Sequence, residues 1–164
     1  MLMFNLVLLE PEIPSNTGNI ARTCAATGSR LHLIQPLGFS VSDRELKRAG
    51  LDYWHLVDVR IHGSLEEFFS AENPTRFWLT STKSAQSYSE VRFQDGDYIF
   101  FGRETRGLPE TFILENLDKA IRIPMREQTR SLNLSNSAAI VLYEALRQCG
   151  FPGLTGQGRF SRME

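Results

Sequence analysis

The chain contains six short runs of apolar residues, and more polar segments with helical spacing separate most of them. The six runs are short, and the first is nearly continuous, which is typical of a strand buried on both faces of a sheet. They lie at residues 4–9, 31–34, 56–61, 77–80, 98–101 and 121–124. We therefore predict six strands, the first of which ends where prolines follow Leu9.

Helix signals fill most of the segments between these strands. Ser15 or Asn16 can cap a helix that ends before Gly28, and Ser64 with Glu67 fits a capping box. The remaining predicted helices lie at residues 43–49, 109–117 and 134–149. Strands that alternate with helices predict one α/β domain, with a mostly parallel six-stranded sheet and helices on both faces. We expect this domain to span residues 1–164, with a disordered tail from about residue 154.

The last predicted helix has an apolar face and a mixed face. At ~100° per residue, one stripe holds only apolar side chains: Leu134, Ala138, Val141, Leu142, Ala145 and Cys149. The opposite face holds Asn136, Ile140, Tyr143 and Arg147. Because Tyr and Arg are favoured where partners dock, this face indicates a contact surface. The alternative is an ordinary solvated face.

Arg22 lies on the polar side of the first predicted helix, ~200° around the helix from Ile20 and Cys24. Gly18 and Asn19 share its side. We interpret this side as an arginine held over a glycine-lined surface that a ligand can approach closely. The alternative is an arginine that is merely solvated.

Composition and charge exclude several functional classes. A net charge of -1 with 18 basic residues argues against a strongly basic nucleic-acid binder, although it permits a local basic surface. No apolar run approaches the ~20 residues that a membrane helix needs, and the first residues do not resemble a signal peptide. We therefore expect a cytoplasmic protein with no membrane partner. Cys24 and Cys149 lie on predicted apolar faces, which indicates buried free thiols.

Ligands of open parallel sheets bind beyond the carboxyl ends of the strands, so the loops after Thr80, Phe101 and Ile123 are the candidate binding loops. The second and third loops carry glycines, amides and hydroxyls. Residues 102–107 do not form a dinucleotide fingerprint, because Glu104 occupies the middle glycine position, and they lack the lysine of a phosphate-binding P-loop.

Metal binding and serine hydrolysis have little support. The three histidines, His32, His55 and His62, are scattered along the chain, and neither cysteine belongs to a CxxC pair. No GxSxG sequence follows a predicted strand. We therefore expect neither a metal centre nor a serine nucleophile.

Three segments together resemble the ordered motifs of the SPOUT superfamily of RNA methyltransferases. They are NTGNIAR at residues 16–22, FGRETRGLP at 101–109, and IRIPM with RSLNLSNSAAIVLYEA at 121–145. The segments EPEIPSNTGN, LHLIQPLGF and RELKRAGLDYW strengthen the similarity to its minimal members, the tRNA 2′-O-methyltransferases of the wobble nucleotide. The resemblance extends from about residue 6 to residue 153.

This resemblance implies properties that the residue patterns alone do not. It implies a deep trefoil knot near the carboxyl end, where the loops after Phe101 and Ile123 clasp S-adenosylmethionine. It also implies a homodimer in which the last helices pack together, and tRNA as the substrate. The implied reaction is methylation of the ribose 2′-hydroxyl of the nucleotide at position 34, without a metal.

Matched position by position, the family's cofactor contacts fall on Thr80, Gly102, Ile123 and Ser131, with Leu132 and Met125 as apolar walls. Arg22 matches the motif-one arginine near the reacting ribose hydroxyl and is the expected catalytic residue. Asn136 and Tyr143 are expected to contact RNA or a second copy of the chain. Arg103 departs from the family pattern, in which proline is expected.

Two other functions fit the same sequence. The substrate could be ribosomal RNA or another tRNA position, although the lack of an added RNA-binding domain favours a small target such as an anticodon loop. A non-catalytic α/β module that binds a nucleotide or RNA is the alternative from a different class.

Overall fold

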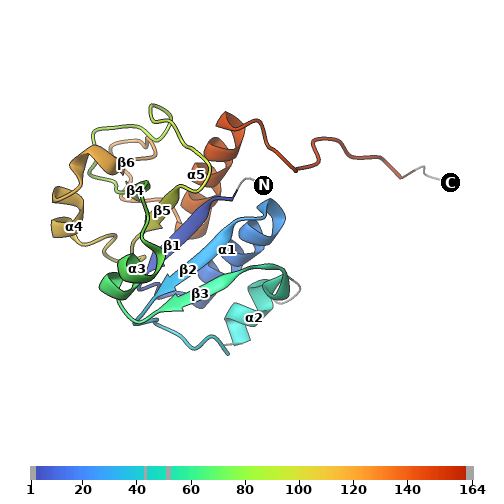
Figure 1. The fold of residues 1–164 in the computed structure, drawn as a ribbon, viewed down its shortest axis with the longest axis horizontal. Helices are drawn as coiled ribbons and strands as arrows, with labels where there is room; N and C mark the ends of the chain where they lie inside the picture. Colours follow the sequence, from blue (N-terminus) through green and yellow to red (C-terminus); the bar gives the residue numbers. More distant parts are fainter. Residues whose placement is uncertain (1–2, 43, 51–52, 162–164) are drawn as a thin grey trace.

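The computed structural model describes residues 3–42, 44–50 and 53–161, and it places six strands in one sheet (Figure 1). Every neighbouring pair is parallel, and the strand order is β3-β2-β1-β5-β4-β6. The strands are β1 (Asn5–Leu9), β2 (Arg30–Ile34), β3 (Val59–His62), β4 (Phe77–Thr80), β5 (Tyr98–Phe101) and β6 (Ala120–Ile121). The predicted α/β class and six-stranded sheet are confirmed, and the described sheet is entirely parallel.

Helices cover both faces of the sheet. One apolar layer forms against α1 (Pro14–Thr27) and α5 (Leu134–Gln148), and the other forms against α3 (Leu65–Glu72) and α4 (Glu110–Leu114). The short helix α2 (Arg44–Gly50) packs on the outside of α1. Single 3₁₀ turns lie at Trp54–Leu56 and Leu117–Lys119.

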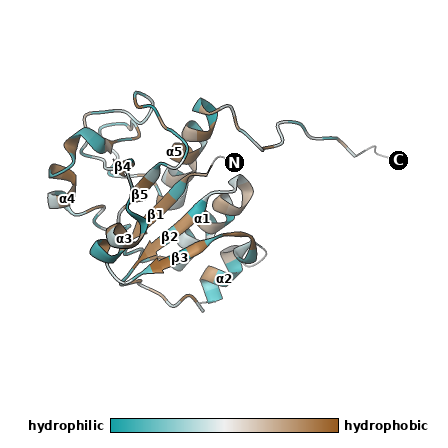
Figure 2. Cartoon of the chain, in the orientation of Figure 1, coloured by the Kyte–Doolittle hydropathy of each residue, from teal (hydrophilic) through white to brown (hydrophobic). Residues whose placement is uncertain are grey.

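The central strand β1 contributes apolar side chains to both faces of the sheet, so helices must pack on both faces. Leu6 and Leu8 pack into the layer under α1 and α5, whereas Val7 and Leu9 pack into the layer under α3 and α4. All five residues of β1 are buried, and Figure 2 shows the strands as the most hydrophobic part of the chain. A strand that alternates between two apolar layers reads as a continuous apolar run.

The predicted apolar stripe of the last helix is confirmed. Ala138, Val141, Leu142 and Ala145 are fully buried, and Leu134 and Cys149 pack against the same layer. The helix ends where Gly150 adopts a φ of 77°, a left-handed conformation that favours glycine. Both cysteines are free: Cys24 is fully buried, which raises the pKa of its thiol, whereas Cys149 is only half-buried, so its predicted burial was wrong.

Three predicted element ends were wrong. The third strand begins at Val59, the partner of Leu31, because Leu56 belongs to the preceding 3₁₀ turn. The helix α4 ends at Leu114 and not at Leu117, because Asn116 has a non-helical backbone conformation. The Asn116 side chain donates to Phe112 O. The last strand has only two residues, because the next residue pairs with the loop at residues 86–88.

A predicted helix cap was also wrong, and one predicted helix start lies outside the described residues. The helix α1 begins at Pro14, after the N-cap Ile13, so neither Ser15 nor Asn16 caps it. Residue Asp43, the predicted start of the second helix, lies outside the described residues.

Residues 155–161 form no helix or strand and extend away from the domain (Figure 1). Within the described ranges, no helix combines the length and apolar character that a bilayer span requires.

The surface around Gly18 is not open to a ligand. A Cβ atom at Gly18 would lie 2.5 Å from Ala49 Cβ and 2.8 Å from Leu46 O, both of α2. Gly18 therefore allows two helices to approach closely. The interpretation of this side of α1 as a glycine-lined ligand surface was wrong.

Candidate functional site

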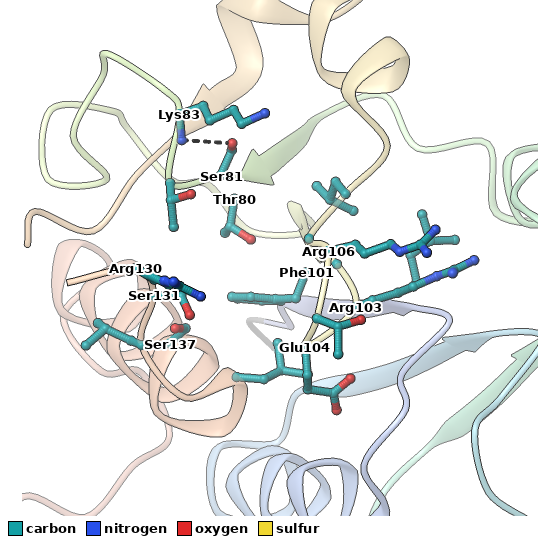
Figure 3. Close-up of a pocket in the computed structure, with 18 of the residues that line it drawn as sticks. Thr80, Ser81, Lys83, Phe101, Arg103, Glu104, Arg106, Arg130, Ser131 and Ser137 are labelled. Atoms are coloured by element: carbon teal, nitrogen blue, oxygen red, sulfur yellow. Dashed lines mark hydrogen bonds between the residues drawn. The ribbon is translucent and has the colours of Figure 1, made fainter. Parts of the chain in front are cut away.

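A cavity of about 940 Å³ opens at the carboxyl edge of the sheet, beyond the ends of β1, β4 and β5 (Figure 3). The loops that follow β4, β5 and β6 form its walls, and residues at the starts of α1 and α5 complete the lining. The connection after β1 runs toward one edge of the sheet, and the connection after β5 runs toward the other edge. The two loops therefore diverge between β1 and β5, which is where parallel sheets commonly bind ligands. The cavity lies where the parallel sheet predicts a binding site.

The loop at residues 102–107 folds back tightly on itself. Gly107 N donates to Arg103 O at 2.8 Å, and Arg103 N donates to Gly107 O at 3.3 Å. A Cβ atom at Gly102 would lie 1.9 Å from Gly107 C and 2.0 Å from Leu108 N, so no other residue fits there without moving the loop. Gly107 itself has a φ of +70°. Both glycines are therefore required by the shape of this cavity wall.

Glu104 of this loop caps the distant helix α1. Its Oε2 accepts a hydrogen bond from Glu12 N at 2.8 Å, and its Oε1 accepts one from Ile13 N at 3.0 Å. These amides belong to the N-cap residue of α1 and the residue before it, next to the positive end of the helix dipole. The cap therefore comes from 91 residues away in the chain and not from the local side chains that we predicted.

Two asparagines extend this contact to the third motif. Asn16 Nδ2 donates to Glu104 Oε1 at 3.4 Å, and Asn133 Nδ2 donates to Asn16 Oδ1 at 3.1 Å. The Oδ1 atom of Asn133 accepts from Ser135 N and Asn136 N and so caps α5. One chain of hydrogen bonds thus joins the start of α1, the loop after β5 and the start of α5.

Hydrogen bonds to backbone carbonyls fix the strand ends and the loop after β4 next to the cavity. Thr80 Oγ1 donates to Phe100 O at 2.7 Å, and Ser84 Oγ donates to Ala120 O at 2.7 Å. Ser81 N donates to Ile121 O at 2.9 Å. Because the Thr80 hydroxyl hydrogen is used within the protein, this hydroxyl can only accept a hydrogen bond from a ligand.

Basic side chains surround the mouth of the cavity. Arg106 and Arg130 are exposed and line it from different loops (Figure 3). Two further cations are paired with carboxylates: Lys83 Nζ lies 2.9 Å from Glu110 Oε2, and Arg103 pairs with Glu10. Exposed arginines beside a cavity favour an anionic partner such as a phosphate backbone. They provide the local basic surface that the overall charge permits.

The structure brings six of the predicted site residues together. One cavity is lined by Thr80, Gly102, Ile123, Met125, Ser131 and Leu132. Arg22, Asn136 and Tyr143 do not line it. Arg22 is exposed, and its guanidinium carbon lies 4.8 Å from the centroid of the Tyr53 ring. Asn136 and Tyr143 are exposed on α5.

Sequence reasoning missed the three residues that join the cavity walls. Asn16, Glu104 and Asn133 all lie within the motif segments, but the pattern around Glu104 indicates only a mismatch to a dinucleotide fingerprint. A signal was present, since Glu104 is the only acidic residue in the segment 102–107 and must find partners if it is partly buried. Its partners could not be deduced, because they lie far away in the chain.

Fold and site together define an α/β protein with a cavity at the carboxyl edge of a parallel sheet, between glycine-containing loops and beside exposed arginines. The model of the SpoU rRNA methylase family matches residues 3–143. The chain therefore belongs to the SpoU rRNA methylase family.

Individual relatives agree with this assignment. The tRNA (cytidine(34)-2'-O)-methyltransferase of Escherichia coli K12 is 54% identical over 153 residues, covering 92% of this chain and 97% of the relative. The protein of the same name from Saccharophagus degradans is also 54% identical, covering 92% and 99%. A solved structure described as giving insights into 2-OH methylation of C/U34 on tRNA has a TM-score of 0.86 and 49% identity, covering 91% and 97%.

Proposed function

We propose that this chain transfers a methyl group from S-adenosylmethionine to the ribose 2′-hydroxyl of nucleotide 34 in tRNA. The similarity to curated methyltransferases over nearly the full length of both chains supports this function most strongly. The substrate is the anticodon loop, and the reaction is a 2′-O-methylation. The chain acts on RNA through the cavity at the carboxyl edge of the sheet.

The cavity suits a donor of this kind in size and chemistry. Its volume of about 940 Å³ is near the upper end of the usual range for small-molecule sites, roughly 300–1,000 Å³. Ile123, Met125 and Leu132 supply apolar walls, and Thr80, Gly102 and Ser131 supply polar groups, largely from the backbone. A bound donor would supply an electrophilic methyl group on a sulfonium, with a neutral thioether as the leaving group. The chain holds the donor, excludes water and aligns the ribose oxygen.

Arg22 stabilises the reacting ribose and does not act as a general base. A guanidinium stays protonated at any physiological pH, so it is a poor acceptor for the hydroxyl proton. Its positive charge can orient a phosphate and stabilise the charge that develops on the oxygen. The proton leaves to another acceptor.

Arg22 reaches the reaction from outside the cavity of its own chain. It lies six residues after Asn16, which is ~9 Å along the helix at ~1.5 Å per residue. A substrate that meets both Arg22 and the donor must therefore span this distance, or a second copy of the chain must bring its own Arg22 to the cavity. A homodimer that packs through the outward face of α5 accounts for the second arrangement.

The path of the chain near its carboxyl end supports the proposed trefoil knot. The loop at residues 86–88 bonds to Arg122 through Arg122 N to Gln86 O at 2.8 Å and Tyr88 N to Arg122 O at 2.9 Å. The chain then passes from β6 at the sheet edge to α5 beside α1. A crystal structure whose backbone tightens into a knot when its two ends are extended would agree with the proposal, and one that straightens would contradict it.

Purified protein, labelled S-adenosylmethionine and unmodified tRNA test the function directly. We expect label in tRNA, and nuclease digestion followed by mass spectrometry should place a 2′-O-methyl group at nucleotide 34. Label in ribosomal RNA or at another tRNA position would contradict the substrate. Donor binding without transfer to any RNA would favour the non-catalytic alternative.

A further inference from the structure

Two histidines and a glutamate meet on the face of the sheet that α3 covers. His32 lies in β2, His62 ends β3 and Glu72 ends α3. His32 Nδ1 lies 3.1 Å from His62 Nε2, and Glu72 Oε1 lies 3.9 Å from the first nitrogen and 3.8 Å from the second. Thirty residues separate the two histidines in sequence, but the fold brings their rings together, so their scattered positions along the chain did not exclude a cluster.

The spacing of these three atoms matches a transition-metal ion. A point equidistant from them lies about 2.1 Å from each, and zinc binds His nitrogen and carboxylate oxygen at roughly 2.0–2.2 Å. The side chains are well buried, with exposed fractions of 0% for His32, 6% for His62 and 9% for Glu72. Two imidazoles and one carboxylate are a ligand set that zinc uses in proteins.

The partners of His32 orient it as a ligand. Asn5 Nδ2 donates to Gly96 O at 3.3 Å, which turns Asn5 Oδ1 toward His32. This oxygen can only accept, so His32 Nε2, 3.3 Å away, carries the ring hydrogen. His32 Nδ1 therefore presents a lone pair to the cluster. A hydrogen bond from the second ring nitrogen to an oxygen is typical of histidines that bind metals.

The contacts of Glu72 favour some ions over others. Arg60 Nη1 lies 3.0 Å from Oε1 and 3.1 Å from Oε2, and Tyr98 OH donates to Oε2 at 3.4 Å. The Arg60 charge opposes a cation, and the cluster offers only one carboxylate. Mg²⁺ and Ca²⁺ prefer several oxygen ligands, whereas Zn²⁺ and Co²⁺ accept imidazole readily.

We propose that His32, His62 and Glu72 form a site for one divalent transition-metal ion, with Zn²⁺ as the preferred ion. None of the three residues lines the cavity at the carboxyl edge, so the site is separate from the proposed reaction. The bound ion cross-links β2, β3 and α3. In its absence the same residues form a hydrogen-bonded pair of imidazoles beside a carboxylate.

Cobalt titration of the tag-free, chelator-treated protein tests this site, because Co²⁺ bound by few ligands gives a visible absorption band. We expect a saturable band that Zn²⁺ displaces, and a rise in Tm when Zn²⁺ is added. His62→Gln and Glu72→Gln should each weaken Co²⁺ binding at least tenfold. His55→Gln is the matched control, since His55 is exposed in the 3₁₀ turn, and it should bind like the wild type.

The outcomes separate a metal site from a hydrogen-bonded pair. A wild-type protein without a saturable band up to millimolar Co²⁺ would overturn the proposal, as would unchanged binding in a folded His62→Gln variant. If that variant does not fold, crystals of the wild type soaked in Zn²⁺ provide the second measurement. An anomalous peak among the three side chains supports the site, and a peak only elsewhere contradicts it. Each readout is independent of methyl transfer.

Discussion

One carboxylate connects parts of the chain that the proposed reaction needs together. Glu104 accepts hydrogen bonds from Glu12 N and Ile13 N at the start of α1, while the backbone of its own loop forms a wall of the cavity. Hydrogen bonds with an ionised acceptor are stronger than neutral ones. The loop after β5 is therefore held by the positive end of α1 as well as by its own glycines.

Glu104→Ala should lower the free energy of unfolding by about 1–3 kcal/mol, because it leaves two backbone N–H groups without their acceptor. It should also weaken donor binding, since the cavity wall loses its support. Glu104→Gln is the matched control, because one amide oxygen can still accept, and its loss should be smaller. Urea unfolding and calorimetry with S-adenosylmethionine measure the two effects. Equal stability of Glu104→Ala and the wild type would contradict the prediction.

Arg22→Ala should reduce methyl transfer roughly 100-fold or more, the magnitude usual for removal of a charge-stabilising group. The affinity for S-adenosylmethionine should stay nearly unchanged, because Arg22 does not line the cavity. Single-turnover transfer to tRNA and calorimetry with the donor measure the two quantities.

Arg22→Lys is the control for this prediction, since it keeps the charge but loses the planar guanidinium. We expect partial activity from this variant if charge is the main contribution. A loss of donor affinity equal to the loss of transfer in Arg22→Ala would mean that Arg22 shapes the cavity. Unchanged transfer would leave Arg22 as a surface residue stacked on Tyr53.

At the scale of elements, α1 and α2 pack closely against each other at Gly18. Gly18→Ala should lower the free energy of unfolding by about 1–3 kcal/mol, because the added methyl group would overlap Ala49 and the Leu46 carbonyl. Asn19→Ala is the control, since Asn19 is exposed on the same helix. Thermal unfolding of both variants tests this. A Gly18→Ala variant as stable as the control would show that α2 moves aside without loss.

Elements with a strong local pattern could be predicted from sequence. The stripe of α5 and the runs of β1 and β5 are visible in a few consecutive residues, because burial on one or two faces fixes their periodicity. Element ends were less predictable, since they depend on distant partners. Val59 begins β3 because Leu31 pairs with it, and the backbone just before α1 is held by Glu104, which accepts from Ile13 N.

In the candidate site, too, only the features with a local sequence pattern could be predicted. Six cavity residues could be named because they lie in loops after parallel strands and in segments that resemble known motifs. The hydrogen bonds that join Asn133, Asn16 and Glu104 could not be predicted. The contact between His32 and His62 could not be predicted either. Each of these contacts joins residues from different elements, and no local pattern encodes which side chains meet across a sheet.

For the whole molecule, the outward face of α5 is the surface through which we propose that two copies of the chain associate. Ile140 and Tyr143 are 37% and 44% exposed on the helix that buries its other side in the core. Exposed aromatic and aliphatic side chains on one helix face favour contact with a partner. A proposed homodimer through this face would bury both residues and place two cavities in one particle.

Tyr143→Ala should weaken self-association roughly tenfold or more, because truncation of a central interface tyrosine removes buried contact area. Sedimentation velocity over a range of protein concentrations measures the dimer, and a filter-binding titration with tRNA measures RNA affinity. Leu117→Ala is the matched control, since Leu117 is 61% exposed in the turn after α4, outside this face. Weaker RNA binding with an unchanged dimer would assign Tyr143 to the RNA contact. If neither quantity changes relative to Leu117→Ala, this face is only solvated.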